Sequence, residues 1–138
     1  MTTTLPKYAR RTDVPAQRTR NALENDLRRW GASQLGFNLE PGRATVAFTL
    51  AGLAVRMTVA LPAEPDAAEE RRRWRELYLV VKAKLVAVSA GISTLEREFL
   101  ADAVVPDPAG GDTTVGALLA GELLDRARTH RRAIEAGR

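Results

Sequence analysis

The residues best suited to chemistry in this sequence are basic, and they gather near its start. Residues 1–32 carry seven basic and three acidic side chains, and this excess of +4 equals the formal net charge of all 138 residues. A guanidinium grips phosphate through paired hydrogen bonds, and each neutralised phosphate releases counterions. The pattern indicates a surface for the phosphate backbone of nucleic acid, formed by Lys7, Arg10, Arg11, Arg18, Arg28 and Arg29.

A second basic cluster includes Arg71 and Arg72, within a charged block at residues 69–76. It either contacts nucleic acid together with the first cluster or forms a solvated first turn of a helix. Solvation is also the alternative for the first cluster. Glu24 lies four residues before Arg28, and Asp26 lies three before Arg29, which are spacings at which opposite charges pair on a helix.

The residue types that enzymes need are scarce. There is no cysteine and a single histidine, His130, so a thiol nucleophile, a thiolate metal site and a disulfide are excluded. No glycine-rich phosphate loop is present. Glu96 with Asp102, or Asp107 with Asp112, is a candidate carboxylate pair for a divalent ion, but helix capping and turn chemistry account for these residues. We therefore expect no enzyme, no metal or cofactor and no small-molecule substrate.

The helix that carries the first cluster is predicted over residues 15–30, after a flexible basic arm at residues 1–12. Pro15 suits a first helical turn because it has no N–H to leave unpaired. Leu23, Leu27 and Trp30 share one face of this helix, and Gly31 ends it. Residues 13–138 are predicted to form a single domain.

After Gly31 the apolar period changes from 3.6 to 2, which predicts three antiparallel strands with turns at Pro41-Gly42 and Gly52. One face of this sheet is apolar and needs a cover of helices. The other face is polar and has no aromatic residue on which a base would stack, so its alternative role is contact with another sheet or subunit. The polar face is formed by Gln34, Asn38, Thr45, Thr49, Arg56 and Thr58.

Three helices are predicted after the strands. The first, at residues 67–90, is apolar nearly all round in its second half, which is typical of a central buried helix. The second, at residues 94–103, begins with a capping box of Ser93 and Glu96. A turn segment at residues 104–112 leads to a last helix, capped by Thr113 or Thr114, whose tail frays from about residue 126. The apolar residues that this last helix carries are Val115, Leu118, Leu119, Leu123 and Leu124.

The predicted fold is therefore α+β, with an N-terminal helix, a three-stranded antiparallel meander and three helices packed on its apolar face. Several segments also resemble a family of proteins. They are Lys7–Ala9, Arg29–Ala32, Val55–Met57, Leu79–Leu85, Gly91–Thr94 and Phe99-Leu100, with Val105–Asp107 and Thr114–Gly116 further on. The family comprises small, mostly uncharacterised bacteriophage and prophage proteins of high-GC actinobacteria. The resemblance implies a phage setting, where basic proteins of this size often serve DNA replication or recombination.

These observations lead to one expected function and one alternative. We expect a non-enzymatic accessory protein that binds nucleic acid, single-stranded DNA in particular, in the cytoplasm of a bacterial host. A homo-oligomer is expected, and no membrane partner, since no apolar stretch reaches the roughly 20 residues that a bilayer crossing needs. The alternative is a protein-interaction module, such as an inhibitor or assembly factor acting on a host or phage protein through an exposed strand edge.

Overall fold

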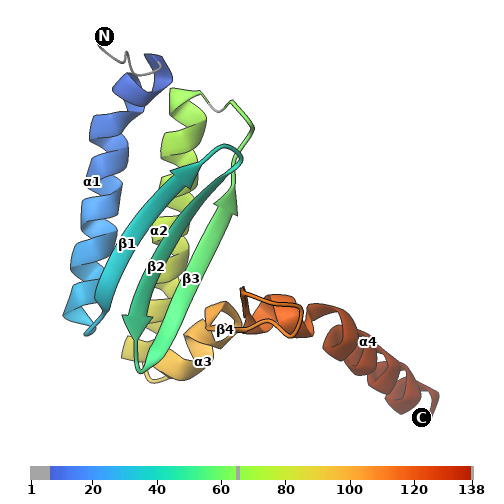
Figure 1. The fold of residues 1–138 in the computed structure, drawn as a ribbon. Helices are drawn as coiled ribbons and strands as arrows, with labels where there is room; N and C mark the ends of the chain where they lie inside the picture. Colours follow the sequence, from blue (N-terminus) through green and yellow to red (C-terminus); the bar gives the residue numbers. More distant parts are fainter. Residues whose placement is uncertain (1–6, 65, 138) are drawn as a thin grey trace.

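The computed structural model describes residues 7–64 and 66–137, with side chains described from Gln17 onward. It has the α+β architecture expected from the sequence (Figure 1). One helix precedes a three-stranded sheet, and the remaining helices and a small hairpin follow it. In chain order the elements are α1 (Lys7–Arg29), β1 (Ser33–Glu40), β2 (Arg43–Leu50), β3 (Leu53–Ala60), α2 (Ala67–Ser89), α3 (Leu95–Phe99), the 3-10 helix η1 (Leu100–Asp102), β4 (Val104–Pro106), β5 (Asp112–Thr114) and α4 (Val115–Ala136).

The sheet is the predicted antiparallel meander, in the order β1-β2-β3. Its register places Phe37 opposite Val46, and Val46 opposite Met57. These residues share the inner face, as the period-two pattern requires. At the two turns Gly42 and Gly52 have φ of 89° and 77°, which only glycine adopts without steric cost.

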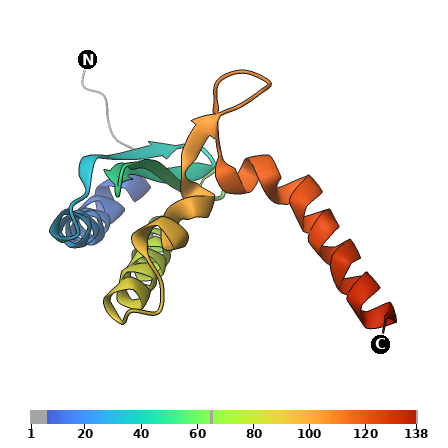
Figure 2. The same ribbon diagram turned by 90° about the horizontal axis from the view of Figure 1, so that it is seen from below.

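Helices α1 and α2 lie side by side over one face of this sheet (Figures 1 and 2). Leu23 and Leu27 of α1 are fully buried, as predicted, and Trp74 of α2 is buried beside them. The Trp74 ring meets Phe37 of β1 edge to face, with 5.7 Å between centroids. The core therefore lies between the two helices and the sheet, and it holds both helices in fixed positions.

The beginning of α1 differs from the prediction. The helix starts at Lys7, eight residues before Pro15, so residues 7–12 are helical and do not belong to an arm. Residues 1–6, the rest of the predicted arm, lie outside the described residues. Alanine and arginine have high helix propensity, which favours a start of α1 on the N-terminal side of Pro15. Proline has no N–H, so one backbone hydrogen bond inside the helix is not formed.

Helix α2 is not buried on all sides, so that prediction was wrong. Its core stripe runs through Trp74, Val81 and Leu85. On the outward side, Leu79 and Val86 are 51% and 56% exposed. The sheet, α1 and α3 pack against the other sides of α2 and leave these residues exposed.

The segment after α2 contains two features that the sequence pattern did not predict. Helix α3 is capped by Thr94, whose hydroxyl accepts from the Arg97 N–H at 3.2 Å, where Ser93 was expected to be the cap. Residues 104–112 were predicted as a turn, but β4 and β5 pair as a short hairpin, with Val105 opposite Thr113. These strands have only three residues each, too few for an alternating pattern to show.

Helix α4 points away from the rest of the molecule (Figure 2). It was predicted to face the core, yet none of its residues is buried. The helix runs to Ala136, past the point at which fraying was expected. The chain reaches it through the β4–β5 hairpin at the edge of the sheet, where Ala103 forms a bridge with Val55 of β3. Because α1 and α2 already cover the apolar face, α4 has no place left on it.

Candidate nucleic-acid interface

The two basic clusters predicted from the sequence meet because α1 and α2 run in the same direction. Near the middle of α1, the Arg20 guanidinium lies 5.4 Å from the Trp74 ring centroid of α2. Further along both helices, the Tyr78 hydroxyl donates to the Asp26 carboxylate at 3.1 Å. The two helices are therefore parallel, and both begin at the same end of the molecule (Figure 1).

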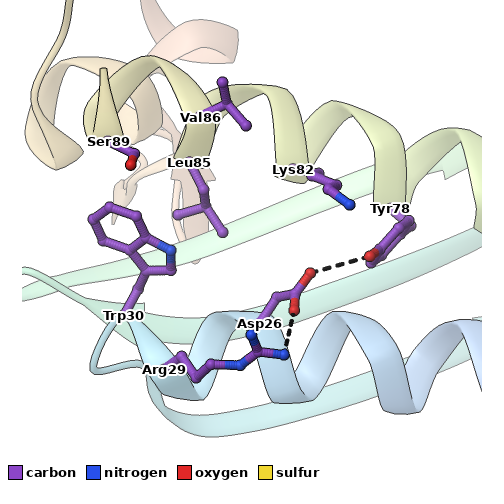
Figure 3. A pocket seen from close by; sticks show the side chains of 8 residues that line it. All are labelled: Asp26, Arg29, Trp30, Tyr78, Lys82, Leu85, Val86 and Ser89. Atoms are coloured by element: carbon purple, nitrogen blue, oxygen red, sulfur yellow. Dashed lines mark hydrogen bonds and ion pairs between the residues drawn. The ribbon is translucent and has the colours of Figure 1, made fainter. Parts of the chain in front are cut away.

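Basic side chains line the junction of these two helices on its outward side. On α2, Arg71, Arg75, Tyr78 and Lys82 recur every three or four residues and so share one face. Figure 3 shows Tyr78 and Lys82 directed toward α1, which places Arg71 and Arg75 on that same side. On α1, the matching face carries Arg18 in the middle of the helix and Arg29 at its C-terminal end. We call this surface the basic strip; it consists of Arg18, Arg29, Arg71, Arg75 and Lys82.

Most of the charge on the basic strip is free to meet a ligand. Among the residues whose side chains the structure describes, Arg18, Arg71 and Arg75 form no ion pair. Asp26 is the acidic residue on the same face of α1, and it is bound by Arg29 at 3.1 Å as well as by Tyr78. Arg29 itself remains 76% exposed. The strip therefore keeps a net positive charge along the junction of the two helices.

At its far end the basic strip opens into a cleft of about 440 Å³ between α1 and α2 (Figure 3). Trp30 and Tyr78 line this cleft, and both are only partly buried. The Lys82 ammonium lies 5.7 Å from the Tyr78 ring centroid, within cation–π range. The cleft thus combines aromatic surface with a cation and an arginine, the combination that holds a nucleobase and its phosphate.

The predicted site residues divide between the strip and other places. Arg28 is paired with Glu24 at 2.9 Å, and Arg72 lies 3.5 Å from Glu76, so each is engaged on its own helix. The pairings of Arg28 and Arg29 are those expected from their spacing. Lys7, Arg10 and Arg11 were also predicted site residues. They lie in the first turns of α1, and their side chains are outside the described part of the structure.

Arg75 and Lys82 complete the basic strip, although neither was among the predicted site residues. Their spacing of four and eleven residues from Arg71 is visible in the sequence. What the sequence does not show is which face of α2 meets α1. Trp74 of α2 is buried in the core, so its ring is not accessible to a nucleobase.

The polar face of the sheet is present as predicted, and it forms the floor of a second groove of about 720 Å³. Thr45 and Thr58 share a hydrogen bond of 3.1 Å across neighbouring strands. Charges of both signs line this groove, including Arg56 and Asp102. Because the charges are mixed and no aromatic side chain lines it, this groove suits phosphate less well than the basic strip does.

The environment of the Asp102 carboxyl changes its titration. Burial raises the pKa of the Asp102 carboxyl, and the charge of Lys84 offsets part of that rise. Within residues 7–64 and 66–137 there is no group of three or more histidine, cysteine or acidic side chains arranged to hold a metal ion. In the same ranges, no helix combines the length and apolar character that a bilayer crossing requires.

Comparison with models of protein families, with curated proteins and with solved structures yields no match for this chain. Function is therefore inferred from the surfaces themselves.

Proposed function

We propose that this protein binds nucleic acid through its phosphate backbone, with the basic strip as the interface. The observation that carries the proposal is the common direction of α1 and α2. It brings Arg18, in the middle of α1, alongside Arg71 and Arg75 in the first half of α2, and none of the three has an ion-pair partner among the described side chains.

The dimensions of the strip suit a single nucleic-acid strand. Arg71 and Lys82 are eleven residues apart on α2, a separation of about 16 Å along the helix axis. That length spans several phosphates of an extended strand. The cleft at the end of the strip presents Trp30 and Tyr78, and bases of one strand are free to stack on aromatic rings whereas paired bases are not. Single-stranded DNA is therefore the preferred ligand, bound with little regard to sequence.

A phage setting, implied by the resemblance of several segments, belongs to the same proposal. In that setting the protein is an accessory factor of replication or recombination in the bacterial cytoplasm.

Fluorescence anisotropy with labelled single-stranded and double-stranded oligonucleotides tests this function. The variant Arg18→Ala/Arg71→Ala/Arg75→Ala removes three exposed strip charges, and we expect its affinity for the single strand at low salt to fall by about tenfold or more. A matched control, Arg43→Ala/Arg56→Ala/Arg97→Ala, makes the same change in net charge away from the strip. It is expected to bind nearly as tightly as the parent.

Two outcomes contradict the proposal. One is the absence of binding by the parent protein at low salt. The other is an equal loss of affinity in both triple variants, which means that overall charge and not the strip determines binding.

Protein contact is the second candidate function, and α4 is the observation that favours it. Leu118, Leu119, Leu123 and Leu124 are each 43% to 50% exposed on a helix whose main contacts within the described part of the chain are with η1 and β5.

A further inference from the structure

Helix α4 is firmly anchored at one end only. The Thr114 hydroxyl accepts from the Ala117 N–H at 3.2 Å and caps the helix, and the Val115 N–H donates to the Ala103 carbonyl at 2.9 Å. A Cβ on Gly116 would lie 2.9 Å from the Ala101 carbonyl oxygen, so the first turn packs closely on η1. From there the helix extends for 22 residues, about 33 Å, without burying any of them.

One side of this helix is apolar along most of its length. Leu119, Leu123, Ala127 and Ile134 recur at helical spacing, and Leu124 lies beside them. Helices in proteins are stabilised mainly by packing of their apolar side, and α4 by itself lacks that packing. The apolar side of α4 therefore calls for a packing partner outside its own chain.

The distribution of charge along α4 indicates which partner it fits. Its first half carries Glu122 and Asp125 and no base, whereas its second half is dominated by arginine. Within the helix, Arg128 with Asp125 and Arg131 with Glu135 each lie at 3.5 Å, and the exposed fractions of these four side chains range from 53% to 78%. Such exposed pairs are weak and are readily exchanged for others. The arginines of the second half are Arg126, Arg128, Arg131 and Arg132.

We propose that α4 pairs with α4 of a second copy of this chain in antiparallel orientation. That arrangement joins the apolar sides and brings Glu122, which lies beside the apolar side in the acidic half of one helix, toward Arg126, which lies beside it in the basic half of the other. Parallel pairing would place arginines against arginines. The same patch serves both copies, as a two-fold interface requires.

Docking of α4 on α2 of another copy fits less well. The exposed apolar residues of α2, Leu79 and Val86, lie beside Arg75 and Lys82, so the arginines of α4 would meet further cations. The self-pairing of α4 does not depend on nucleic-acid binding, because the basic strip and α4 are separate surfaces.

Light scattering coupled to size-exclusion chromatography tests the interface. The parent is expected to elute with twice the 15.0 kDa mass of the chain. In Leu119→Glu/Leu123→Glu we expect loss of the dimer and the mass of one chain, since both leucines are exposed and the body of the protein does not need them. The matched control, Leu79→Glu/Val86→Glu on α2, is expected to remain dimeric. A monomeric parent, or a control that dissociates while the α4 variant does not, overturns the proposal.

Orientation is tested by a spin label, which the absence of native cysteine makes simple. A label on Ala136→Cys is expected to give a distance of about 30 Å between copies in the antiparallel pair, since the two labels lie at opposite ends. Parallel helices 8–10 Å apart would bring the labels to within about 20 Å, and that result contradicts the proposal.

Discussion

The hydroxyl of Tyr78 donates a hydrogen bond of 3.1 Å to the carboxylate of Asp26, across the junction of α1 and α2. The two residues are 52 positions apart in the chain, so this bond fixes the relative position of two helices that the sequence places far from each other. Asp26 also binds Arg29 at 3.1 Å. One carboxylate thus joins the helices and holds an arginine of the basic strip.

Removal of that hydroxyl is expected to weaken the helix junction modestly. In Tyr78→Phe the ring remains, and the free energy of unfolding should fall by about 0.5–1.5 kcal/mol, the net value of a typical hydrogen bond. Urea denaturation followed by circular dichroism measures the change. Asp26→Asn keeps an acceptor for Tyr78 and loses only an exposed ion pair, so its effect should be the smaller of the two. An unchanged unfolding midpoint for Tyr78→Phe would show that the bond does not stabilise the junction.

The last residue of α3 and the first residue of η1 should respond very differently to truncation. Phe99 is 1% exposed and meets Phe48 edge to face with 5.7 Å between ring centroids. Phe99→Ala leaves a cavity in the core and should cost about 3–5 kcal/mol. Leu100, the next residue, is 52% exposed, and Leu100→Ala should change stability by less than about 0.5 kcal/mol. Equal losses in the two variants, measured by thermal and urea unfolding, would contradict this placement of the core.

The sheet and its turns could be predicted from the sequence because their signals are local. Alternating apolar residues mark the strands, and Gly42 and Gly52 mark turns that need positive φ. The inner face of α1 was equally clear, since Leu23 and Leu27 lie one turn apart.

The exposure of the outward face of α2 and the position of α4 could not be predicted from the sequence. Both depend on how many helices are needed to bury the apolar face of the sheet. Leu79 and Leu119 look like core residues in sequence and are exposed in the structure. The basic strip was predicted only in part for the same reason. Both clusters are visible in the sequence, but the common direction of α1 and α2 arises from contacts between residues such as Arg20 and Trp74.

The raised pKa of Asp102 predicts a defined pH dependence. Because burial favours the neutral carboxyl, the folded protein holds this proton more strongly than the unfolded chain does. The contribution to stability is therefore present below the unfolded value of 3.8 and is lost as pH rises through the folded pKa. Asp102→Asn, which stays neutral, should gain stability relative to the parent between pH 3 and pH 7. Urea unfolding of both proteins at the two pH values measures this, and a difference that is constant with pH contradicts it.

The turn between β2 and β3 contains a residue under backbone strain. Ala51 has φ of 53°, in the left-handed region, and Gly52 follows it with φ of 77°. Asparagine tolerates this region better than alanine, and Asn-Gly is the preferred pair for a two-residue hairpin with positive φ at both positions. Ala51→Asn is therefore expected to raise the free energy of unfolding by about 0.5–1 kcal/mol. The same change at the exposed strand residue Ala54 should not stabilise, and a gain there as large as at Ala51 would point to a cause other than the turn.

The central claim is that Arg18, Arg71 and Arg75 neutralise phosphates, and the salt dependence of binding tests it most directly. For single strands the logarithm of the binding constant falls with the logarithm of salt concentration by about 0.7 for each neutralised phosphate. The Arg18→Ala/Arg71→Ala/Arg75→Ala variant should therefore show a slope shallower by about 2, while Arg43→Ala/Arg56→Ala/Arg97→Ala keeps the slope of the parent. Identical slopes for the parent and the strip variant would contradict the account.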